Sequence, residues 1–397
     1  MASCGSSYNG NPNGINPDTP NGQIVIPSKL KHRAFISNQF SGNIQIVDSA
    51  NDFTAYYSTN NGVTQNTNQI VDLAVNIPVA SSLTFLVVSP NFAMTAAYDP
   101  NALSISLVDN STETSTAALA LPAWAGMAVF SPDSSTLYVP TGNANGIQVI
   151  DVSTATISSA IFLPSVRVVA LNPAGTMMLA FTDNSDSMWV INLGASTITP
   201  VAVPGFSRPV NAFFSSDGNT AYVLNCGNQC GGTASPSVVQ FDMTAQMIKA
   251  TVAVGGATVG LLSGSTLYVA GYAGGAKGML DAVDISNMTR STATSIAIND
   301  GQQSIMALNN NMLYIGAKTC SNSVTGCLSI VNVSTNTAVA PGPPLGPVTG
   351  LQSIPNRNVM YVIQGGLLDI YDTTSSTQLP TIGFRGAVYG VVQIDQQ

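Results

Sequence analysis

Short apolar runs separated by polar turns recur along almost the whole chain. In Thr136–Asp151, two runs rich in β-branched and aromatic residues flank the Gly/Asn segment Gly142–Gly146, and an aspartate closes the second run. This pattern is typical of a β-hairpin. We find no window in which apolar residues recur with the period of an amphipathic helix. The pattern therefore predicts an all-β protein.

The hairpin repeats, and each copy closes on Asp or Asn roughly every 40–50 residues, which is the period of β-propeller blades with about four strands each. Eight copies predict eight four-stranded blades. Seven blades are the alternative, because the first spacing is the longest and the second copy lacks a Tyr-Val core. The eight hairpins span Ala34–Asp48, Met94–Asp109, Thr136–Asp151, Met177–Asn192, Thr220–Asp242, Thr266–Asp284, Met312–Asn332 and Val359–Asp372.

A recurrent tripeptide inside these hairpins resembles the YVTN-type β-propeller repeat family. The best matches are Leu137-Tyr-Val, Ala221-Tyr-Val, Leu267-Tyr-Val and Met360-Tyr-Val, and the resemblance covers about residues 33–395. It implies the propeller fold. It implies no particular activity, because propellers host many unrelated functions.

The two ends of the repeat complement one another. The first hairpin has no inner strand before it, whereas Ala387–Ile394 reads as an inner strand without a hairpin. Pairing of the N- and C-terminal strands would complete one blade and remove open sheet edges. We therefore expect a single propeller domain over residues 24–397, preceded by a flexible tether over residues 1–23 that is poor in apolar residues.

Cysteine positions indicate an oxidising compartment. Of five cysteines, Cys226 and Cys230 share one hairpin loop, and Cys320 and Cys327 share the corresponding loop two copies later. Two local disulfides are predicted. The alternative is one four-thiolate zinc site, which the spacings and the distance between the loops disfavour.

The remaining cysteine, Cys4, lies in Ala-Ser-Cys-Gly-Ser-Ser, which resembles the end of a bacterial lipoprotein signal. A lipid on Cys4 would hold an exported head on the outer membrane or cell surface, or in the periplasm. The alternative is a chance cysteine near the start. The chain as given contains no signal peptide and no transmembrane run.

Composition argues against several partners. Charged residues make up only 8% of the chain and the net charge is −8, so broad binding to nucleic acid or to an anionic membrane surface is not expected.

Residues for catalysis are scarce. Glu113 is the only glutamate and His32 the only histidine, so haem d1 and copper propellers, which need histidine ligands, are poor analogues, and we expect no cofactor and no metal. Asp183-Asn-Ser-Asp186 is a weak calcium candidate without the glycine-centred loop of an EF-hand. The recurrent aspartates fit Asx turns better than metal binding, and they are Asp48, Asp109, Asp151, Asp242, Asp284 and Asp372.

Residues that precede each inner strand are expected at one mouth of the propeller, where a ligand would bind. Arginine beside an aromatic ring suits a carboxylate, a sugar acid or a peptide terminus. The alternative is that each arginine hydrogen-bonds loop carbonyls for structural reasons. The residues at these positions are Trp124, Arg167, Phe206, Arg208, Gln303, Phe384 and Arg385.

Two classes of function fit these features. The favoured one is a non-enzymatic, exported, surface-associated propeller that binds or assembles protein or polysaccharide partners. The alternative is a propeller enzyme that acts on a small anionic or sugar substrate at the channel mouth.

Overall fold

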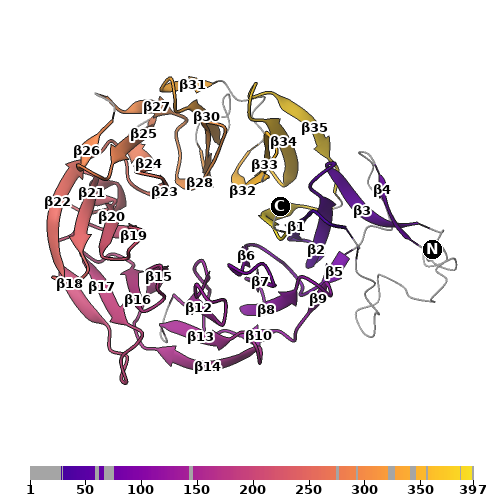
Figure 1. Cartoon of the computed structure of the whole chain (residues 1–397), viewed down its shortest axis with the longest axis horizontal. Helices are drawn as coiled ribbons and strands as arrows, with labels where there is room; N and C mark the ends of the chain where they lie inside the picture. Colours follow the sequence, from indigo (N-terminus) through magenta and orange to yellow (C-terminus); the bar gives the residue numbers. More distant parts are fainter. Residues whose placement is uncertain are drawn as a thin grey trace. The chain divides into compact units, whose positions relative to one another are not determined.

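The computed structural model describes residues 28, 30–58, 62–66, 76–142, 146–273, 277–291, 294–320, 327–339, 346–354, 356–384 and 386–395. Within these ranges the chain forms eight antiparallel sheets and the short 3-10 helix η2 (Gly227–Cys230). The fold is an eight-bladed β-propeller, as the hairpin repeat predicts, and the seven-bladed alternative is wrong (Figure 1).

Blade 1 comprises β36 (Val388–Gln393), β1 (Arg33–Asn38), β2 (Asn43–Asp48), β3 (Phe53–Ser58), β4 (Gly62–Asn66) and β5 (Asn76–Pro78). Blade 2 comprises β6 (Leu86–Val88), β7 (Met94–Asp99), β8 (Ser104–Asp109), β9 (Thr114–Ser115) and β10 (Leu119–Ala120). Blade 3 comprises β11 (Val129–Phe130), β12 (Thr136–Pro140), β13 (Ile147–Asp151) and β14 (Thr156–Ile161). Blade 4 comprises β15 (Val166–Leu171), β16 (Met177–Thr182), β17 (Ser187–Asn192) and β18 (Val201–Pro204).

Blade 5 comprises β19 (Pro209–Phe214), β20 (Thr220–Asn225), β21 (Ser237–Asp242) and β22 (Met247–Ala253). Blade 6 comprises β23 (Val259–Ser263), β24 (Thr266–Ala273), β25 (Lys277–Asp284), β26 (Thr289–Arg290) and β27 (Ile296–Ile298). Blade 7 comprises β28 (Gln303–Asn309), β29 (Met312–Ala317), β30 (Leu328–Asn332) and β31 (Thr337–Val339). Blade 8 comprises β32 (Val348–Ile354), β33 (Val359–Gln364), β34 (Leu367–Asp372) and β35 (Gln378–Ile382).

The chain divides into two compact units. One comprises Met1–Ala120, Gly366–Leu368 and Pro380–Gln397, and it contains blades 1 and 2. The other comprises Leu121–Gly365 and Asp369–Leu379, and it contains blades 3 to 7. No helix among the described residues is long and apolar enough to cross a membrane.

In the second unit, the core lies between neighbouring blades. Leu179 and Phe181 of β16 pack with Val223 and Phe241 of blade 5. The first strands of successive blades contact one another from β11 to β32, and the fourth strands form the opposite edges of the sheets (Figure 1). Because both faces of the middle strands pack on neighbours, these strands carry continuous apolar runs instead of strict alternation.

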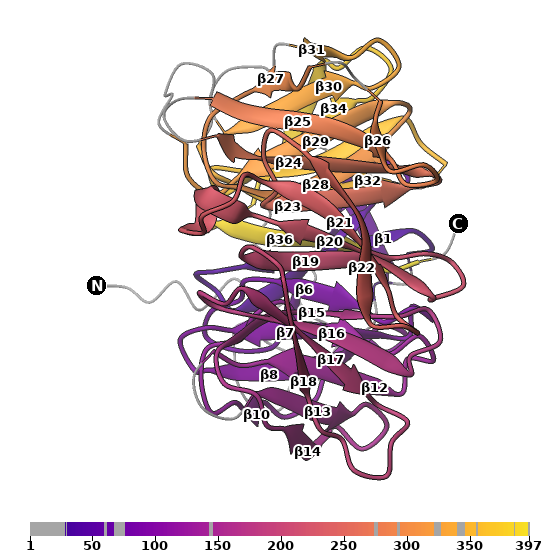
Figure 2. The ribbon, with the colours of Figure 1, turned by 90° about the vertical axis from the view of Figure 1, so that its left-hand side faces the viewer.

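The fourth strands are the exposed elements of this unit. Figure 2 shows β14, β18 and β22 of three successive blades on the side that faces the viewer. Ile157, Val201 and Met247 on these strands are exposed although they are apolar.

The N- and C-terminal strands pair in blade 1, as the orphan run Ala387–Ile394 predicts. β36 lies antiparallel to β1, with Phe35 opposite Val392 and Ala34 opposite Gln393. The Arg33 carbonyl accepts a hydrogen bond from the Ile394 amide at 3.1 Å, which extends the pairing past the end of β36. Phe35 and Ile46 are fully buried in one cluster with Ile394.

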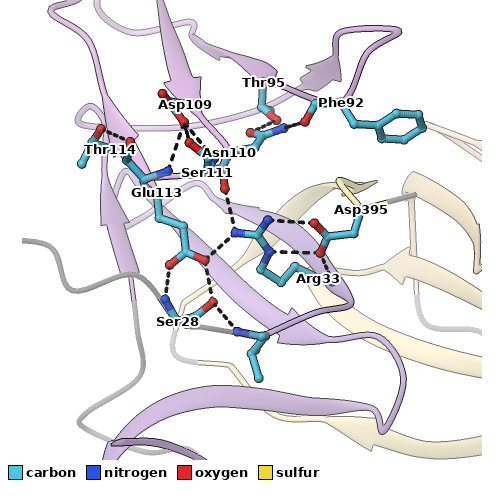
Figure 3. Close-up of polar contacts among 12 residues, drawn as sticks. Ser28, Arg33, Phe92, Thr95, Asp109, Asn110, Ser111, Glu113, Thr114 and Asp395 are labelled. Carbon is cyan, nitrogen blue, oxygen red and sulfur yellow. Dashed lines mark hydrogen bonds and ion pairs between the residues drawn. The ribbon is translucent and has the colours of Figure 1, made fainter. Parts of the chain in front are cut away.

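A buried ionic cluster fastens this junction (Figure 3). Arg33 donates through Nε and Nη2 to both carboxylate oxygens of Asp395, at 3.0 and 2.7 Å, and through Nη1 to Glu113 at 2.8 Å. Glu113 is fully buried and also accepts hydrogen bonds from the amide, at 2.6 Å, and the hydroxyl of Ser28. Burial opposes the charge on Arg33, but hydrogen bonds to Asp395 and Glu113 outweigh it and raise the pKa of Arg33. The only glutamate of the chain is thus a structural residue.

The recurrent aspartates form Asx turns, as predicted. Asp109 Oδ1 accepts the amides of Ser111 and Thr112 at 2.8 and 3.0 Å, and Asp242 Oδ1 accepts those of Thr244 and Ala245 at 2.9 and 2.8 Å. Four residues after the capping side chain, seven of the blades have a non-glycine residue with positive φ: Asp52, Glu113, Ala155, Gln246, Met288, Asn336 and Ser376. The same turn therefore reverses the chain in these seven blades.

Removal of the Arg33 side chain tests the ionic cluster. We expect Arg33→Ala to lower the free energy of unfolding by about 3–5 kcal/mol, because the buried Glu113 carboxylate would then have no cation beside it. Glu113→Gln added to Arg33→Ala should recover part of the loss. Urea unfolding measures both. Lys249→Ala is the control, because Lys249 pairs with Asp242 at 3.4 Å on the surface and such pairs contribute about 1 kcal/mol or less. Equal losses in Arg33→Ala and Lys249→Ala would contradict the role given to the cluster.

The Asx turns predict how stability responds to acid. Hydrogen bonds from the Thr374 hydroxyl and from the Thr374 and Ser375 amides lower the pKa of Asp372. A carboxyl whose pKa is lower in the folded state stabilises the protein above its unfolded pKa, near 3.9, and this stabilisation is lost as pH falls through the folded pKa.

Asp372→Asn should therefore flatten part of the decline in unfolding free energy below about pH 4. Folding at pH 7 should be largely preserved, because Asn192 and Asn332 already cap the equivalent turns through Oδ1. Urea titrations from pH 7 to 3 measure the difference, and identical pH profiles would contradict it.

Candidate functional site

Trp124 and Arg167 form the centre of the candidate site. The guanidinium carbon of Arg167 lies 4.6 Å from the centroid of the Trp124 ring, which is cation–π geometry. Trp124 precedes β11, and Arg167 is the second residue of β15 in the next blade. The Trp124 ring packs against the backbone of Gly142, where an added Cβ would lie 1.8 Å from Cζ2 of the indole.

The turn Asp183–Asp186 connects Arg167 with Arg208. Asp183 Oδ1 accepts a hydrogen bond from Arg167 Nε at 2.7 Å. At the other end of the turn, Asp186 Oδ1 accepts the Arg208 amide at 3.0 Å and lies 3.7 Å from Arg208 Nε. Two of the predicted rim arginines are therefore held at opposite ends of one four-residue turn.

The Arg208 side chain is less exposed than that of Arg167. It is 21% exposed, and Nη2 donates to the Gly231 carbonyl at 3.3 Å. The structural alternative, an arginine bonded to a loop carbonyl, thus describes Arg208. Arg167 differs, because its side chain is 57% exposed and its hydrogen-bond partner is a carboxylate.

The charges in this group balance. Arg167 and Arg208 face Asp183 and Asp186, and the Asp186 side chain is 61% exposed. The site is thus a mixed surface with exposed donors and acceptors side by side. Such a surface suits a ligand that has both a carboxylate and hydroxyl groups.

The other predicted rim residues that the structure describes are buried. Phe206 is 6% exposed and packs against Phe241, with ring centroids 6.0 Å apart. Gln303 is 1% exposed and donates to the Asn299 carbonyl at 2.8 Å. Phe384 is 9% exposed. Arg385 lies outside the described residues. Of the two predicted arginines that the structure describes, Arg167 has the more exposed side chain.

Both predicted disulfides are present, Cys226–Cys230 and Cys320–Cys327, so the zinc alternative is wrong. Two disulfides indicate an oxidising, extracytoplasmic environment. Cys4, the candidate for lipidation, lies outside the described residues. The described part of the chain contains no group of three or more His, Cys, Asp or Glu side chains that could hold a metal ion.

The sequence identifies Asp183 and Asp186 only as weak calcium candidates, and it does not predict their pairing with the arginines. Their spacing to Arg167 and Arg208 carries no local signal, because the contacts join different strands and blades. The sequence identifies Gly142 only as a turn residue, and its contact with Trp124 depends on how the hairpin packs against the segment before β11.

No protein-family model and no curated protein matches the chain. Solved structures do. The dihydro-heme d1 dehydrogenase NirN, in complex with DHE, is 11% identical with a TM-score of 0.70 over 96% of this chain and 79% of that one. A functionally unknown protein from Desulfotomaculum acetoxidans is 12% identical, with a TM-score of 0.57 over 92% and 99% of the two chains. The Cps50 (Swd1) β-propeller domain of Myceliophteria thermophila is 11% identical, with a TM-score of 0.55 over 73% and 96%. At these identities the similarity supports the fold alone.

The contact between Gly142 and Trp124 gives a spectroscopic prediction. The chain has two tryptophans, so Trp189→Phe leaves Trp124 as the only indole. In that background, Gly142→Ala should shift the Trp124 emission to longer wavelength, because the new methyl group displaces the ring from its packed position. Gly194→Ala is the control, since its Cβ would meet nothing closer than 3.5 Å. The same emission maximum in both variants would contradict the packing described.

Proposed function

We propose that this protein is an exported, non-enzymatic β-propeller that binds an acidic polysaccharide through Arg167 beside Trp124. The observation that carries the proposal is that the Arg167 guanidinium is held in a fixed position and is also exposed to solvent. It is fixed by the Trp124 ring and by Asp183, yet its side chain is 57% exposed. A guanidinium held in place before the ligand arrives loses little entropy on binding.

The hydrogen-bonding geometry leaves room for a ligand carboxylate. Asp183 bonds to Nε, and with the described residues the two terminal amino groups of Arg167 make no hydrogen bond. A carboxylate can accept two parallel bonds from these amino groups without displacing Asp183. The exposed Asp186 carboxylate can accept hydrogen bonds from neighbouring hydroxyl groups. A uronic acid has a carboxylate and several hydroxyls on one ring, so it satisfies both sets of groups.

Export is supported by the two disulfides, which persist in oxidising compartments. A surface position and a lipid on Cys4 are part of the proposal. The low content of charged residues, 8%, fits a surface of Ser, Thr, Asn and Gln that contacts glycans or proteins outside the cell.

Enzymatic activity is the weaker candidate. NirN is an enzyme of the same fold, but the similarity at 11% identity supports no shared chemistry. In this chain the only glutamate is buried in the Arg33 ionic cluster, which removes it from the candidates for an accessible acid or base.

Binding of polygalacturonate, measured by isothermal titration calorimetry, tests the proposal. We expect the wild-type protein to bind polygalacturonate and not neutral dextran. Arg167→Ala should weaken binding about tenfold or more, equivalent to about 1.4 kcal/mol. Arg167→Lys should also weaken it, because an ammonium group cannot form the two parallel bonds.

Lys249→Ala is the matched control, because it removes an exposed cation of blade 5 outside the site. Equal affinities for Arg167→Ala and Lys249→Ala would refute the site. If the wild-type protein does not bind polygalacturonate but binds a peptide through its terminal carboxylate, the ligand is a peptide and the polysaccharide proposal is wrong.

A further inference from the structure

Arg208 has a backbone conformation that its sequence position disfavours. Its φ is 51°, in the left-handed region that side chains with a Cβ rarely adopt. The next residue is Pro209, and a residue before proline is pushed toward extended conformations. Strained residues of this kind persist only where the surrounding structure fixes them, and they concentrate at functional sites.

Contacts on three sides hold Arg208 in this conformation. Its amide donates to Asp186 Oδ1 at 3.0 Å, and its carbonyl accepts the Cys226 amide at 3.0 Å. Its guanidinium donates to the Gly231 carbonyl at 3.3 Å. Cys226 is one end of the loop that the Cys226–Cys230 disulfide closes, and Gly231 directly follows the other end.

The same loop is anchored on the neighbouring blade. Gln229 donates through Nε2 to the Gly255 carbonyl at 3.2 Å and accepts the Ala257 amide through Oε1 at 3.3 Å. The loop also approaches the residues before β19 closely, since a Cβ on Gly232 would lie 2.9 Å from Arg208 Cγ and 2.7 Å from Ser207 Oγ. A short, cross-linked loop fixed at both sides is a rigid support for Arg208.

We infer that the Cys226–Cys230 disulfide is a positioning element of the ligand site. It holds Arg208 in its left-handed conformation, Arg208 in turn holds Asp186, and the Asp183–Asp186 turn fixes Arg167. This inference rests on the proposed function for its effect on ligand affinity. Its structural part, the support of Arg208, stands on the contacts alone. Cys320–Cys327 lies in blade 7 and makes none of these contacts within the described ranges.

The experiment compares the full-length Cys226→Ser/Cys230→Ser and Cys320→Ser/Cys327→Ser proteins. The first should bind polygalacturonate about tenfold more weakly than wild type, and the second should keep the wild-type affinity. Hydrogen exchange gives an independent readout. The amides of Arg208 and of Gly227, which donates to the Ser207 carbonyl at 3.0 Å, should exchange at least tenfold faster in the first variant alone. Wild-type exchange rates and affinity in Cys226→Ser/Cys230→Ser would overturn the inference.

Gly232→Ala keeps both disulfides and pushes the loop away from Arg208, so it tests the same support if the cysteine variant does not fold. It should accelerate exchange at Arg208 and weaken binding, and an unchanged exchange rate would overturn the inference. If the wild-type protein does not bind polygalacturonate, the proposed function fails, while the exchange rates still decide whether the disulfide supports Arg208.

Discussion

The closure of blade 1 is the constraint on which the rest of this structure depends. β1 and β36 come from opposite ends of the sequence, and each would otherwise leave a sheet edge without a partner. Backbone pairing is reinforced by Arg33, whose guanidinium bonds to Asp395 next to β36 and to the buried Glu113 of blade 2. Buried ion pairs of this kind are costly to break from one side, because the remaining charge stays desolvated. The Arg33 cluster therefore ties the ends of the chain to a neighbouring blade.

A second constraint acts within each blade. Between the third strand and the strand that follows, an Asp or Asn side chain accepts backbone amides, and in seven of the blades a residue with positive φ follows four positions later. This local device reverses the chain without long-range contacts, so similar sequence signals give similar hairpins. The loops that connect the second strand of each blade to the third strand do not share a common turn of this kind. They differ between blades, and the disulfides, the Asp183–Asp186 turn and the Gly142 loop occur there.

Those loops supply the carboxylates that lie beside the arginines of the candidate site. A rim of unpaired arginines would attract any anion. Here Arg167 and Arg208 each have a carboxylate nearby, and the local charge is balanced. Under the proposed function, selectivity would come from the geometry of the Arg167 guanidinium and of the exposed oxygens, which favours a ligand with matched groups over a merely acidic one. The left-handed backbone conformation of Arg208 is held by its hydrogen bonds with Asp186, Cys226 and Gly231.

The sequence by itself determined the eight hairpins, their closing Asx turns, both disulfides and the pairing of the terminal strands. These features depend on local spacing or on a repeat that can be counted, so residues such as Asp109 and Cys226 carry their own signal. Tertiary structure alone decided the partners of Arg167 and Arg208, the burial of Phe206, Gln303 and Glu113, and the packing of Gly142 on Trp124. Each of these joins side chains from different strands or blades. Their distances depend on how the sheets pack, which no local pattern records.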